Sequence, residues 1–316
     1  MNCLIACSRL NMKTPIGRLA PSPTGVLHLG NARSFLLAWL DIRARQGSIL
    51  LRIEDLDGPR IRAGAEQAAI EDLQWLGLDW DGPIVRQSER LDLYRKVLQQ
   101  LQDKQCAYPC ICSRRDVEQA ASAPHAGEEG PIYPGTCRKG VPHQGHATEL
   151  NYRFLVSPGI TTFEDRFAGT ISYDIAKQLG DFVIWKRDDE PAYQLAVVVD
   201  DSAMGVTDVL RGDDLLSSAA RQLQIYAALE LQPPQFAHVP LIRGEDGRRL
   251  AKRHGDTSLR AFRQQGVSAE SVLGWLAWKS GLKESATPCT AAQLVADFDL
   301  QQVTPEPITW HGSFST

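Results

Sequence analysis

The feature that most constrains the fold is an alternation of strand-like and helix-like segments near the start of the chain. The stretch IGRLAPS, residues 16–22, predicts a short strand that runs into a loop, and SILLRIED, residues 48–55, predicts a buried strand that ends in acids. Helical periodicity covers residues 35–45 and 63–76. Strands and helices that alternate at this spacing favour a parallel, doubly wound sheet. We therefore expect an α/β fold.

The connection between the first strand and the first helix has an unusual composition. It reads APSPTGVLHLGNARS, residues 20–34, and holds two prolines that fix their φ angles and two glycines that let the backbone turn or approach a ligand closely. The following helix offers unpaired N–H groups and a positive dipole end, which suit a phosphate. His28 and Asn31 lie at that end as hydrogen-bond donors. The alternative is an ordinary proline turn that caps a helix.

Composition excludes several classes of protein. The chain has 316 residues, of which 43% are hydrophobic, and a formal net charge of −4, so it is not a generally basic nucleic-acid binder. No apolar run approaches the ~20 residues that span a bilayer, so we expect no membrane association. The chain has seven cysteines, an odd number, and they are unevenly distributed along the sequence. This pattern favours free thiols or a metal site over a disulfide framework. A cytoplasmic location is therefore expected.

The amino-acid composition of the chain changes between residues 106 and 146. Cysteine, glycine, proline and histidine dominate there, and hydrophobic periodicity fades, which indicates an inserted module or a long functional loop. Cys110 and Cys112 form a Cys-x-Cys pair, and Cys137 follows. Three thiolates suit zinc, and a tetrahedral site needs a fourth ligand. The histidines His125, His143 and His146 are candidates for that ligand, and the alternative is a metal-free loop with reduced cysteines.

Elements in the rest of the chain are less regular. Helical periodicity covers residues 90–101 and 217–231, and residues from 257 onward also look helical. The segments expected to form strands joined by turns are 151–156, 161–174 and 181–201.

Several long motifs, in order, resemble one enzyme family. The string HLGN at residues 28–31 resembles the HIGH signature of class I aminoacyl-tRNA synthetases. The longer string GRLAPSPTGVLHLGNAR, together with LLRIEDLD, resembles the glutamyl branch of that class. The resemblance continues through PAYQLAVVVDDSAMGVTDVLRGDDLLSSAARQLQIY and GRRLAKRHGDTSL, so it runs from about Gly17 into the 260s. Agreement among several motifs outweighs any single match.

The resemblance implies a fold and a division of the chain. A Rossmann-type, doubly wound parallel sheet would carry an inserted zinc-containing α+β module and a C-terminal helical region that resembles a stem-contact domain. The expected boundaries are 14–104 for the first half of the catalytic domain, 105–190 for the module, 191–243 for the second half, and 244–316 for the KMSKS-like loop and helical subdomain.

A second nucleotide motif is implied at residues 249–253, RLAKR, which matches the KMSKS lysine loop of the class. Lys252 falls on the family's second lysine, which neutralises charge on the triphosphate, while Ala251 replaces a serine. The alternative is a solvated basic loop. The residues that the resemblance assigns to ATP are His28, Gly30, Asn31 and Lys252, of which His28, Asn31 and Lys252 are the expected catalytic residues, with Mg²⁺ accompanying ATP.

Glutamate itself limits what its pocket must contain. It carries two carboxylates and one ammonium, so a specific pocket needs two cationic or polar holders and one carboxylate, and the planar fork of arginine pairs carboxylate well. Arg18, Arg211 and Glu54 match positions that bind glutamate in the glutamyl family. The resemblance adds Leu19, Ala20, Pro21, Ser22 and Tyr193 to the expected glutamate site.

The cysteine module and the chain length point to one branch. The spacing from Tyr133 to Cys137 resembles the glutamyl-queuosine tRNA(Asp) synthetases, in which a tyrosine oxygen completes one structural zinc site, so Cys110, Cys112, Tyr133 and Cys137 are the implied ligands. The chain stops soon after KRHGDTSL, whereas full glutamyl-tRNA synthetases continue into an anticodon-binding domain. The shortened enzymes attach glutamate to the queuosine base at the anticodon wobble position of tRNA(Asp).

The expected activity is therefore that of a ligase that activates L-glutamate with ATP and transfers it to tRNA(Asp) carrying queuosine. Basic residues between 248 and 263 would contact tRNA phosphates, and we expect a monomer. Two alternatives stay open: a truncated glutamyl-tRNA synthetase that charges a tRNA 3′ end, and a non-catalytic paralogue that binds tRNA or nucleotide.

Overall fold

The central feature of the fold is a parallel sheet. The computed structural model describes residues 14–56, 58–120, 131–141, 150–250 and 257–314. Strands β1 (Ile16–Leu19), β2 (Ser48–Ile53) and β3 (Val85–Arg86) pair in parallel in the order β1–β2–β3. Strands β9 (Asp208–Gly212) and β10 (Gln235–Val239) form a second parallel pair.

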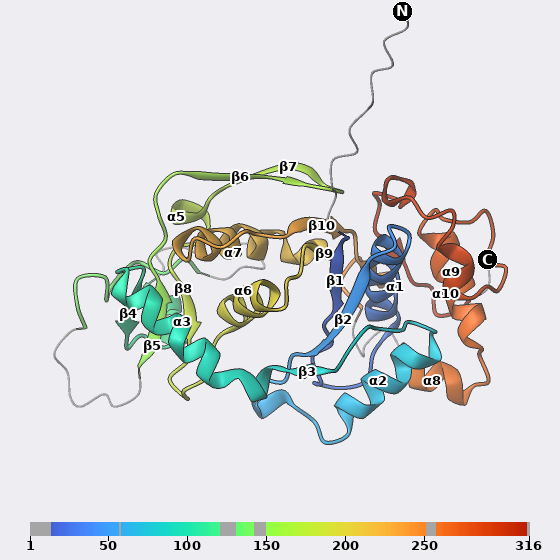
Figure 1. Ribbon diagram of the computed structural model, residues 1–316, viewed down its shortest axis with the longest axis horizontal. Coiled ribbons are helices and arrows are strands. Elements are labelled where there is room, and N and C mark those ends of the chain that lie inside the picture. Colours follow the sequence, from blue (N-terminus) through green and yellow to red (C-terminus); the bar gives the residue numbers. More distant parts are fainter. Residues whose placement is uncertain (1–13, 57, 121–130, 142–149, 251–256, 315–316) are drawn as a thin grey trace, which may run out of the picture.

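The two sets of strands meet between β1 and β9. The Thr207 N–H donates to the carbonyl of Ile16 at 2.9 Å, and the Arg18 guanidinium reaches the carbonyl of Leu210 at 3.4 Å. The two strands therefore lie side by side and run in the same direction, and the strands follow one another in the order β3–β2–β1–β9–β10 (Figure 1). Because the chain leaves β1 and β9 toward opposite edges, their carboxyl ends form a switch point, where such sheets bind ligands.

Helices cover both faces of this sheet. On one face lie α1 (Leu29–Arg43) and the C-terminal helices, and on the other lie α6 (Tyr193–Ala203) and α7 (Leu216–Ala228) (Figure 1). Helix α2 (Ala65–Trp75) follows β2. One apolar core joins β1, β2 and α1 to α9, and a second joins α3 (Leu91–Asp103) to α6 and α7. The expected α/β class is confirmed by these parallel strands and their covering helices.

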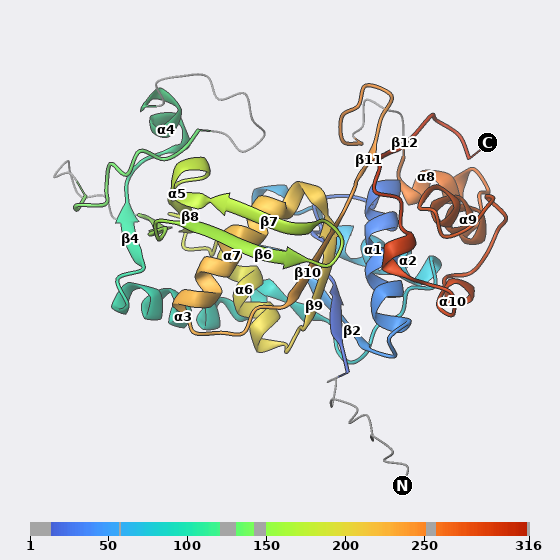
Figure 2. The ribbon, with the colours of Figure 1, turned by 90° about the horizontal axis from the view of Figure 1, so that it is seen from above.

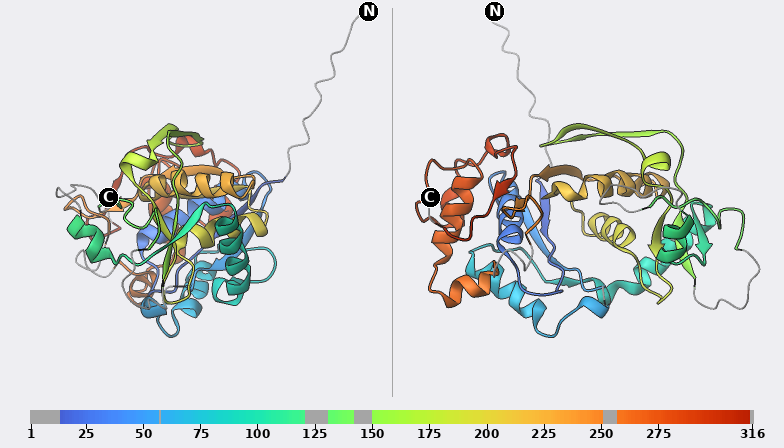
Figure 3. Two further views of the ribbon diagram at one scale, coloured as in Figure 1. Left: turned by 90° about the vertical axis from the view of Figure 1, so that its left-hand side faces the viewer. Right: turned by 180° about the vertical axis from the view of Figure 1, so that it is seen from behind.

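A smaller antiparallel sheet lies at one end of the molecule. It has the order β4–β5–β8, with β4 (Ala107–Cys110), β5 (Asn151–Phe154) and β8 (Phe182–Trp185). Helix α4 (Arg114–Ala120) follows β4. Figure 3 shows this sheet at the opposite end of the molecule from the C-terminal helices.

A hairpin inserted between β5 and β8 of the smaller sheet reaches the larger sheet with its turn. Strands β6 (Ile160–Asp165) and β7 (Gly169–Asp174) form it, and α5 (Ile175–Gln178) follows. Figure 2 shows the hairpin running over α7 with its turn beside β10. The Arg166 N–H donates to the carbonyl of Phe236 at 2.8 Å, which fastens the turn to that strand.

The C-terminal part packs against α1. It contains α8 (Leu259–Gln264), α9 (Ala269–Lys279) and α10 (Ala291–Leu294), and β11 (Ile242–Arg243) pairs in parallel with β12 (Ile308–Thr309). The rings of Trp275 and Trp310 pack edge to face 5.1 Å apart. Short 3₁₀ turns lie at Gly58–Arg60, Gln87–Arg90, Asp213–Leu215 and Leu300–Gln302.

In the part of the chain that the structure describes, no helix is both long and apolar enough to cross a membrane.

Three expectations about elements differ from the structure. Residues 193–201 were expected to be extended, yet they lie in helix α6, because a helix buried from Leu195 to Asp201 presents no polar face in its sequence. Residues after 257 are only partly helical, since irregular segments separate α8, α9 and α10. Helix α1 also begins six residues before the periodicity predicted. The domain boundaries at residues 104, 190 and 243 stay predictions.

Candidate active site

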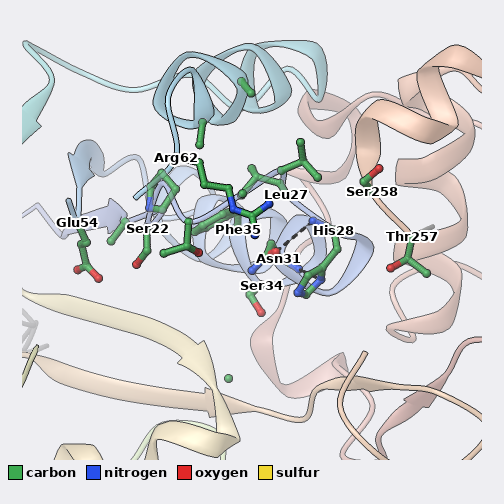
Figure 4. A pocket seen from close by; sticks show the side chains of 18 of the residues that line it. Ser22, Leu27, His28, Asn31, Ser34, Phe35, Glu54, Arg62, Thr257 and Ser258 are labelled. Carbon is green, nitrogen blue, oxygen red and sulfur yellow. Dashed lines mark hydrogen bonds between the residues drawn. The ribbon is translucent and has the colours of Figure 1, made fainter. Parts of the chain in front are cut away.

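A large cavity opens at the carboxyl ends of β1, β2 and β9. Its volume is about 1470 Å³, and residues 257–264 close one side of it. Figure 4 shows Ser22 and Glu54 toward one end and His28, Thr257 and Ser258 toward the other. The sheet thus delivers residues far apart in sequence to a single cavity.

At one end of the cavity, His28 caps helix α1. Its Nδ1 accepts hydrogen bonds from the backbone N–H groups of Gly30 and Asn31, at 3.1 and 3.3 Å, and the Asn31 Oδ1 accepts from the His28 N–H at 3.1 Å (Figure 4). The other backbone N–H groups of the first turn are also hydrogen-bonded. The Leu29 N–H donates to the carbonyl of Thr257, and the Ala32 N–H donates to the carbonyl of His28. The expectation that this helix offers unpaired N–H groups is therefore wrong.

Two donors remain at this helix end after capping. Burial, with a smaller contribution from Arg249, lowers the pKa of His28 to about 4, so its ring is neutral near pH 7. Since Nδ1 accepts two hydrogen bonds, the proton resides on Nε2. That N–H and the Asn31 side-chain amide, together with the helix dipole, are the groups that can meet an anion here.

The segment that follows the lysine-loop motif is fastened to the cap. The Leu29 N–H donates to the carbonyl of Thr257, and the Leu259 N–H donates to that of Leu27, both at 2.9 Å. Arg249, before the motif's centre, pairs with Asp214 at 2.8 Å and lines the cavity. Lys252 and Ala251 lie outside the described residues.

At the other end of the cavity, buried charges of both signs gather. The Nη1 of Arg52 contacts Asp201 at 2.6 Å, and its Nη2 donates to Glu54 at 3.0 Å. The Nε of Arg18 lies 3.7 Å from Asp201, and its Nη1 donates to the carbonyl of Leu210 at 3.4 Å. Arg52 and Asp201 are thus a buried pair that supports Glu54 and Arg18 beside the cavity.

Arg18 has unused hydrogen-bonding capacity. Its Nε is buried and makes no hydrogen bond within the described residues. Burial lowers the pKa of Arg18, while Asp201 opposes that effect. Burial likewise raises the pKa of Glu54, which Arg52 and Arg18 oppose. A carboxylate on Arg18 and an ammonium on Glu54 would each stabilise the charged form of its partner.

Arg211 is held far more firmly than Arg18. Its Nε donates to Nε2 of His238 at 2.9 Å, and its Nη2 donates to Oε1 of Gln222 at 2.9 Å. The remaining Nη1 lies 3.4 Å from the hydroxyl of Tyr193, which also lines the cavity. The guanidinium is 5.1 Å from the centre of the Phe236 ring. One edge of the Arg211 fork therefore faces the cavity in a fixed orientation.

The structure brings most of the expected site residues to this one cavity. The lining residues that the sequence indicated are Arg18, Ala20, Pro21, Ser22, His28, Asn31, Glu54, Tyr193 and Arg211. Leu19 lies in the core with a fully buried side chain, and Gly30 lies under the His28 ring, where an added Cβ would be 3.0 Å from Cε1. Their assigned contacts stay predictions.

Sequence reasoning missed several residues of the site. Arg60 and Arg62 line the cavity, and the basic string GPRIR directly after LLRIEDLD was an available signal. Arg52 and His238 lie behind the lining residues, and only the tertiary fold connects them with the site.

The cysteines form a second cluster, in the smaller sheet. The Sγ atoms of Cys110, Cys112 and Cys137 all lie within 4.8 Å of one another, and Cys112 and Cys137 are 3.7 Å apart. The hydroxyl of Tyr133 lies 3.4 Å from the Cys110 sulfur and 3.7 Å from the Cys112 sulfur. Tetrahedral zinc–thiolate bonds of about 2.3 Å place sulfurs roughly 3.8 Å apart. The cluster is therefore consistent with a zinc site.

Arg153 supports the same cluster. Its guanidinium stacks 3.8 Å above the ring centre of Tyr133, and its Nε lies 3.3 Å from the Cys110 sulfur. The Cys137 N–H donates to the Tyr133 hydroxyl at 2.8 Å, which fixes the position of that oxygen. The rival histidines His125, His143 and His146 lie outside the described residues.

Comparison with known proteins identifies the family of this fold and cavity. Residues 16–306 match the family described as tRNA synthetases class I (E and Q), catalytic domain. That match covers most of the chain, so the chain belongs to this family.

Individual relatives show which members of the family the chain resembles in sequence and in length. The chain is 49% identical over 285 residues to the Glutamyl-Q tRNA(Asp) synthetase of Rhodopirellula baltica, a match that covers 86% of each protein. It is 48% identical to the protein of that name from Symbiobacterium thermophilum, covering 92% of this chain and 94% of the relative. Glutamate–tRNA ligase 2 of Syntrophus aciditrophicus is 40% identical, but only 63% of its length is covered.

Solved structures agree with this assignment. A glutamate tRNA ligase from Elizabethkingia meningosepticum, crystallised in complex with its amino acid, superposes with a TM-score of 0.80 at 28% identity. That match covers 94% of this chain and 67% of the ligase. The α/β fold is therefore that of a class I synthetase catalytic domain.

Proposed function

We propose that the chain is a ligase that glutamylates the queuosine base at the anticodon wobble position of tRNA(Asp) in two steps. A glutamate carboxylate oxygen first attacks the α-phosphorus of ATP, which forms glutamyl-adenylate and releases pyrophosphate. A hydroxyl of the queuosine ring then attacks the activated carbonyl carbon, AMP leaves, and the hydroxyl loses its proton. Positioning and charge stabilisation supply the catalysis.

The observation that carries the proposal is the arrangement of Arg18, Arg211 and Glu54 around one end of the cavity. Two guanidinium groups match the two carboxylates of glutamate, and Glu54 matches its ammonium. Behind the lining residues, Arg52 compensates the charge of Glu54 and Asp201 compensates that of Arg18. The pocket therefore needs little reorganisation when glutamate binds. Tyr193 and Ser22 contribute hydroxyl groups at the same end.

The nucleotide occupies the His28 end of the cavity in this proposal. The Nε2–H of His28 and the amide of Asn31 donate to phosphate oxygens that gain charge during adenylate formation. Lys252 of the KMSKS-like motif contributes a further cation, and Mg²⁺ accompanies ATP. Arg60 and Arg249 line the same cavity and add positive charge that suits the phosphates of ATP.

Queuosine as the acceptor is supported by the relatives named for that reaction, which the chain covers over 86% and 94% of their length. The anticodon loop of tRNA(Asp) would enter the mouth of the cavity, where Arg62 and Arg260 can meet its phosphates. Such contacts position the RNA, whereas the queuosine ring selects the substrate.

The cysteine cluster holds one structural zinc ion in this proposal. Cys110, Cys112 and Cys137 supply thiolates and Tyr133 supplies its oxygen, which completes four ligands. When bound, zinc would hold the end of β4 to the segment that carries Tyr133 and Cys137 and would take no part in glutamyl transfer, because the cluster lies in the smaller sheet.

The experiment that tests the proposal measures transfer of radiolabelled glutamate to purified tRNA(Asp). Three substrates are compared: tRNA with queuosine, tRNA with guanosine at that position, and queuosine-containing tRNA from which the 3′-terminal adenosine has been removed. We expect labelling of the first and third only. Labelling that depends on the 3′ adenosine would instead indicate a glutamyl-tRNA synthetase that charges the 3′ end.

A further inference from the structure

A buried histidine and aspartate lie behind Arg211, outside the lining of the cavity. His238 belongs to β10 and Asp165 to the end of β6, and both side chains are fully buried. The Nδ1 of His238 lies 2.6 Å from the Asp165 Oδ2, and its Nε2 lies 2.9 Å from the Arg211 Nε. The three side chains form a continuous chain of hydrogen bonds that ends at the cavity.

The direction of these hydrogen bonds follows from the chemistry of the two ends. Arginine can only donate, so the Nε2 of His238 must be the acceptor, and the imidazole proton must reside on Nδ1. That proton is donated to Asp165. Burial lowers the pKa of His238, and hydrogen bonds lower the pKa of Asp165 to about 2 against the effect of burial, so the histidine is neutral and the aspartate charged.

Asp165 is itself fixed by the hairpin turn. Its Oδ1 accepts from the N–H groups of Phe167 and Ala168, at 3.0 and 2.8 Å, and from the His238 N–H at 3.0 Å. Figure 2 shows this turn of β6 and β7 resting beside β10. The orientation of the Asp165 carboxylate, and with it the His238 tautomer, is therefore determined by backbone contacts.

We propose that Asp165 and His238 are positioning residues that fix the Arg211 fork for glutamate. The proposal rests on the role of Arg211 in the proposed function. His238 holds Nε and Gln222 holds Nη2, which leaves the Nη1 edge toward Tyr193 and the cavity. If the proton of His238 were on Nε2, two N–H donors, Nε2 of His238 and Nε of Arg211, would face each other. Their repulsion would displace the Arg211 guanidinium.

Two substitutions at one residue separate the two contacts of His238. In His238→Asn the amide takes the place of Nδ1, so it still contacts Asp165 but does not reach Arg211. In His238→Gln the amide takes the place of Nε2, so its oxygen still accepts from Arg211. In glutamate-dependent ATP–pyrophosphate exchange, we expect His238→Asn to raise the KM for glutamate about tenfold to hundredfold. We expect His238→Gln to raise it much less, with the KM for ATP unchanged in both.

The variant Asp165→Asn tests the tautomer. Its amide donates to Nδ1 of His238 and so moves the imidazole proton to Nε2, facing Arg211. We expect a raised KM for glutamate in Asp165→Asn, and little further increase when Asp165→Asn is added to His238→Gln. Thr162→Ala is the matched control, because Thr162 lies in the same hairpin and its hydroxyl pairs with that of Ser172 across it.

The outcomes distinguish this inference from the proposed function. If the wild-type protein binds glutamate by calorimetry and supports exchange, but His238→Asn and His238→Gln show equal KM values for glutamate, the positioning role is refuted. A parallel loss of activity toward glutamate and ATP, with a lower melting temperature, would also refute it and indicate a purely structural pair. No binding of glutamate to the wild type would instead refute the proposed function.

Discussion

The glutamate end of the cavity and the cysteine cluster are both collections of buried polar groups, but they are stabilised differently. Around the cavity, guanidinium groups and carboxylates alternate, so Arg52, Asp201 and Glu54 compensate one another within the protein. In the cluster, three sulfurs and one hydroxyl face one another, and the guanidinium of Arg153 lies beside them. The first set of groups is complementary by itself, whereas the second set consists of electron-pair donors that a metal ion would hold together.

Because of this difference, we expect the geometry of the glutamate pocket to be independent of its ligand and the stability of the cysteine cluster to depend on its metal. A compensated pocket keeps its geometry without substrate, which favours catalysis by preorganisation. A cluster of thiols gains much of its stability from the metal, because binding free energy there is also folding free energy. Substitutions that affect one region should therefore leave the other nearly unchanged.

The largest effect is expected for Arg211→Lys. Lysine keeps the charge but cannot donate to His238 and Gln222 while presenting a fork to the cavity. We expect kcat/KM for glutamate in the exchange reaction to fall by about 100-fold or more, with zinc content unchanged. Arg95→Lys, at an exposed pair with Asp189, is the control. A loss of less than threefold would show that Arg211 does not hold glutamate.

Removal of zinc comes next in size. A chelator, or Cys112→Ser, is expected to lower the melting temperature by about 5 °C or more while the KM for glutamate stays within about twofold of wild type. Cys106→Ser is the matched control, since Cys106 lies near the cluster in sequence but outside it. A rise in the KM for glutamate on loss of the metal would show that the two regions are coupled, and it would contradict their independence.

A smaller effect is expected for Tyr133→Phe. The variant keeps the ring under Arg153 but removes the oxygen that lies 3.4 Å from the Cys110 sulfur. We expect the zinc affinity, measured by competition with a chromogenic chelator, to fall about tenfold. Zinc affinity equal to that of the wild type would exclude Tyr133 as a ligand and leave the fourth position to another group.

The smallest effect concerns His28 and pH. Its pKa is about 4 in the folded protein, below the usual value of 6.5, so the unfolded chain binds the proton more readily. The stability that neutral His28 contributes is therefore present above pH 6.5 and is lost as the pH falls toward 4. Urea unfolding of His28→Asn, which keeps a capping side chain, should show a shallower loss over this window. An identical pH dependence in both proteins would contradict the assignment.

Sequence reasoning was most successful where the relevant residues are close together in the chain. His28 and Asn31 share one motif, and Arg18 and Glu54 lie directly at the ends of two neighbouring strands, so their meeting at one cavity follows from parallel pairing. The three cysteines were found in the same way, because they dominate a stretch with little else to form a core.

What could not be predicted depends on contacts between distant segments. Asp165 and His238 are 73 residues apart, and neither residue stands out in its own stretch of sequence. Helix α6 escaped prediction because it is buried from Leu195 to Asp201, so the alternation of polar and apolar residues that distinguishes a helix from a strand is missing. Of the N–H groups in the first turn of α1, that of Leu29 is paired by Thr257, which follows α1 by more than two hundred residues.

The most direct test of the compensated glutamate pocket is ATP–pyrophosphate exchange by the wild-type protein in the absence of tRNA, with glutamate, glutamine or aspartate as the amino acid. Only glutamate combines two carboxylates with the spacing that Arg18 and Arg211 are proposed to recognise. We expect exchange with glutamate and at least about 100-fold less with the other two. Equal exchange with glutamine, or none with any amino acid, would contradict the assignment of this pocket.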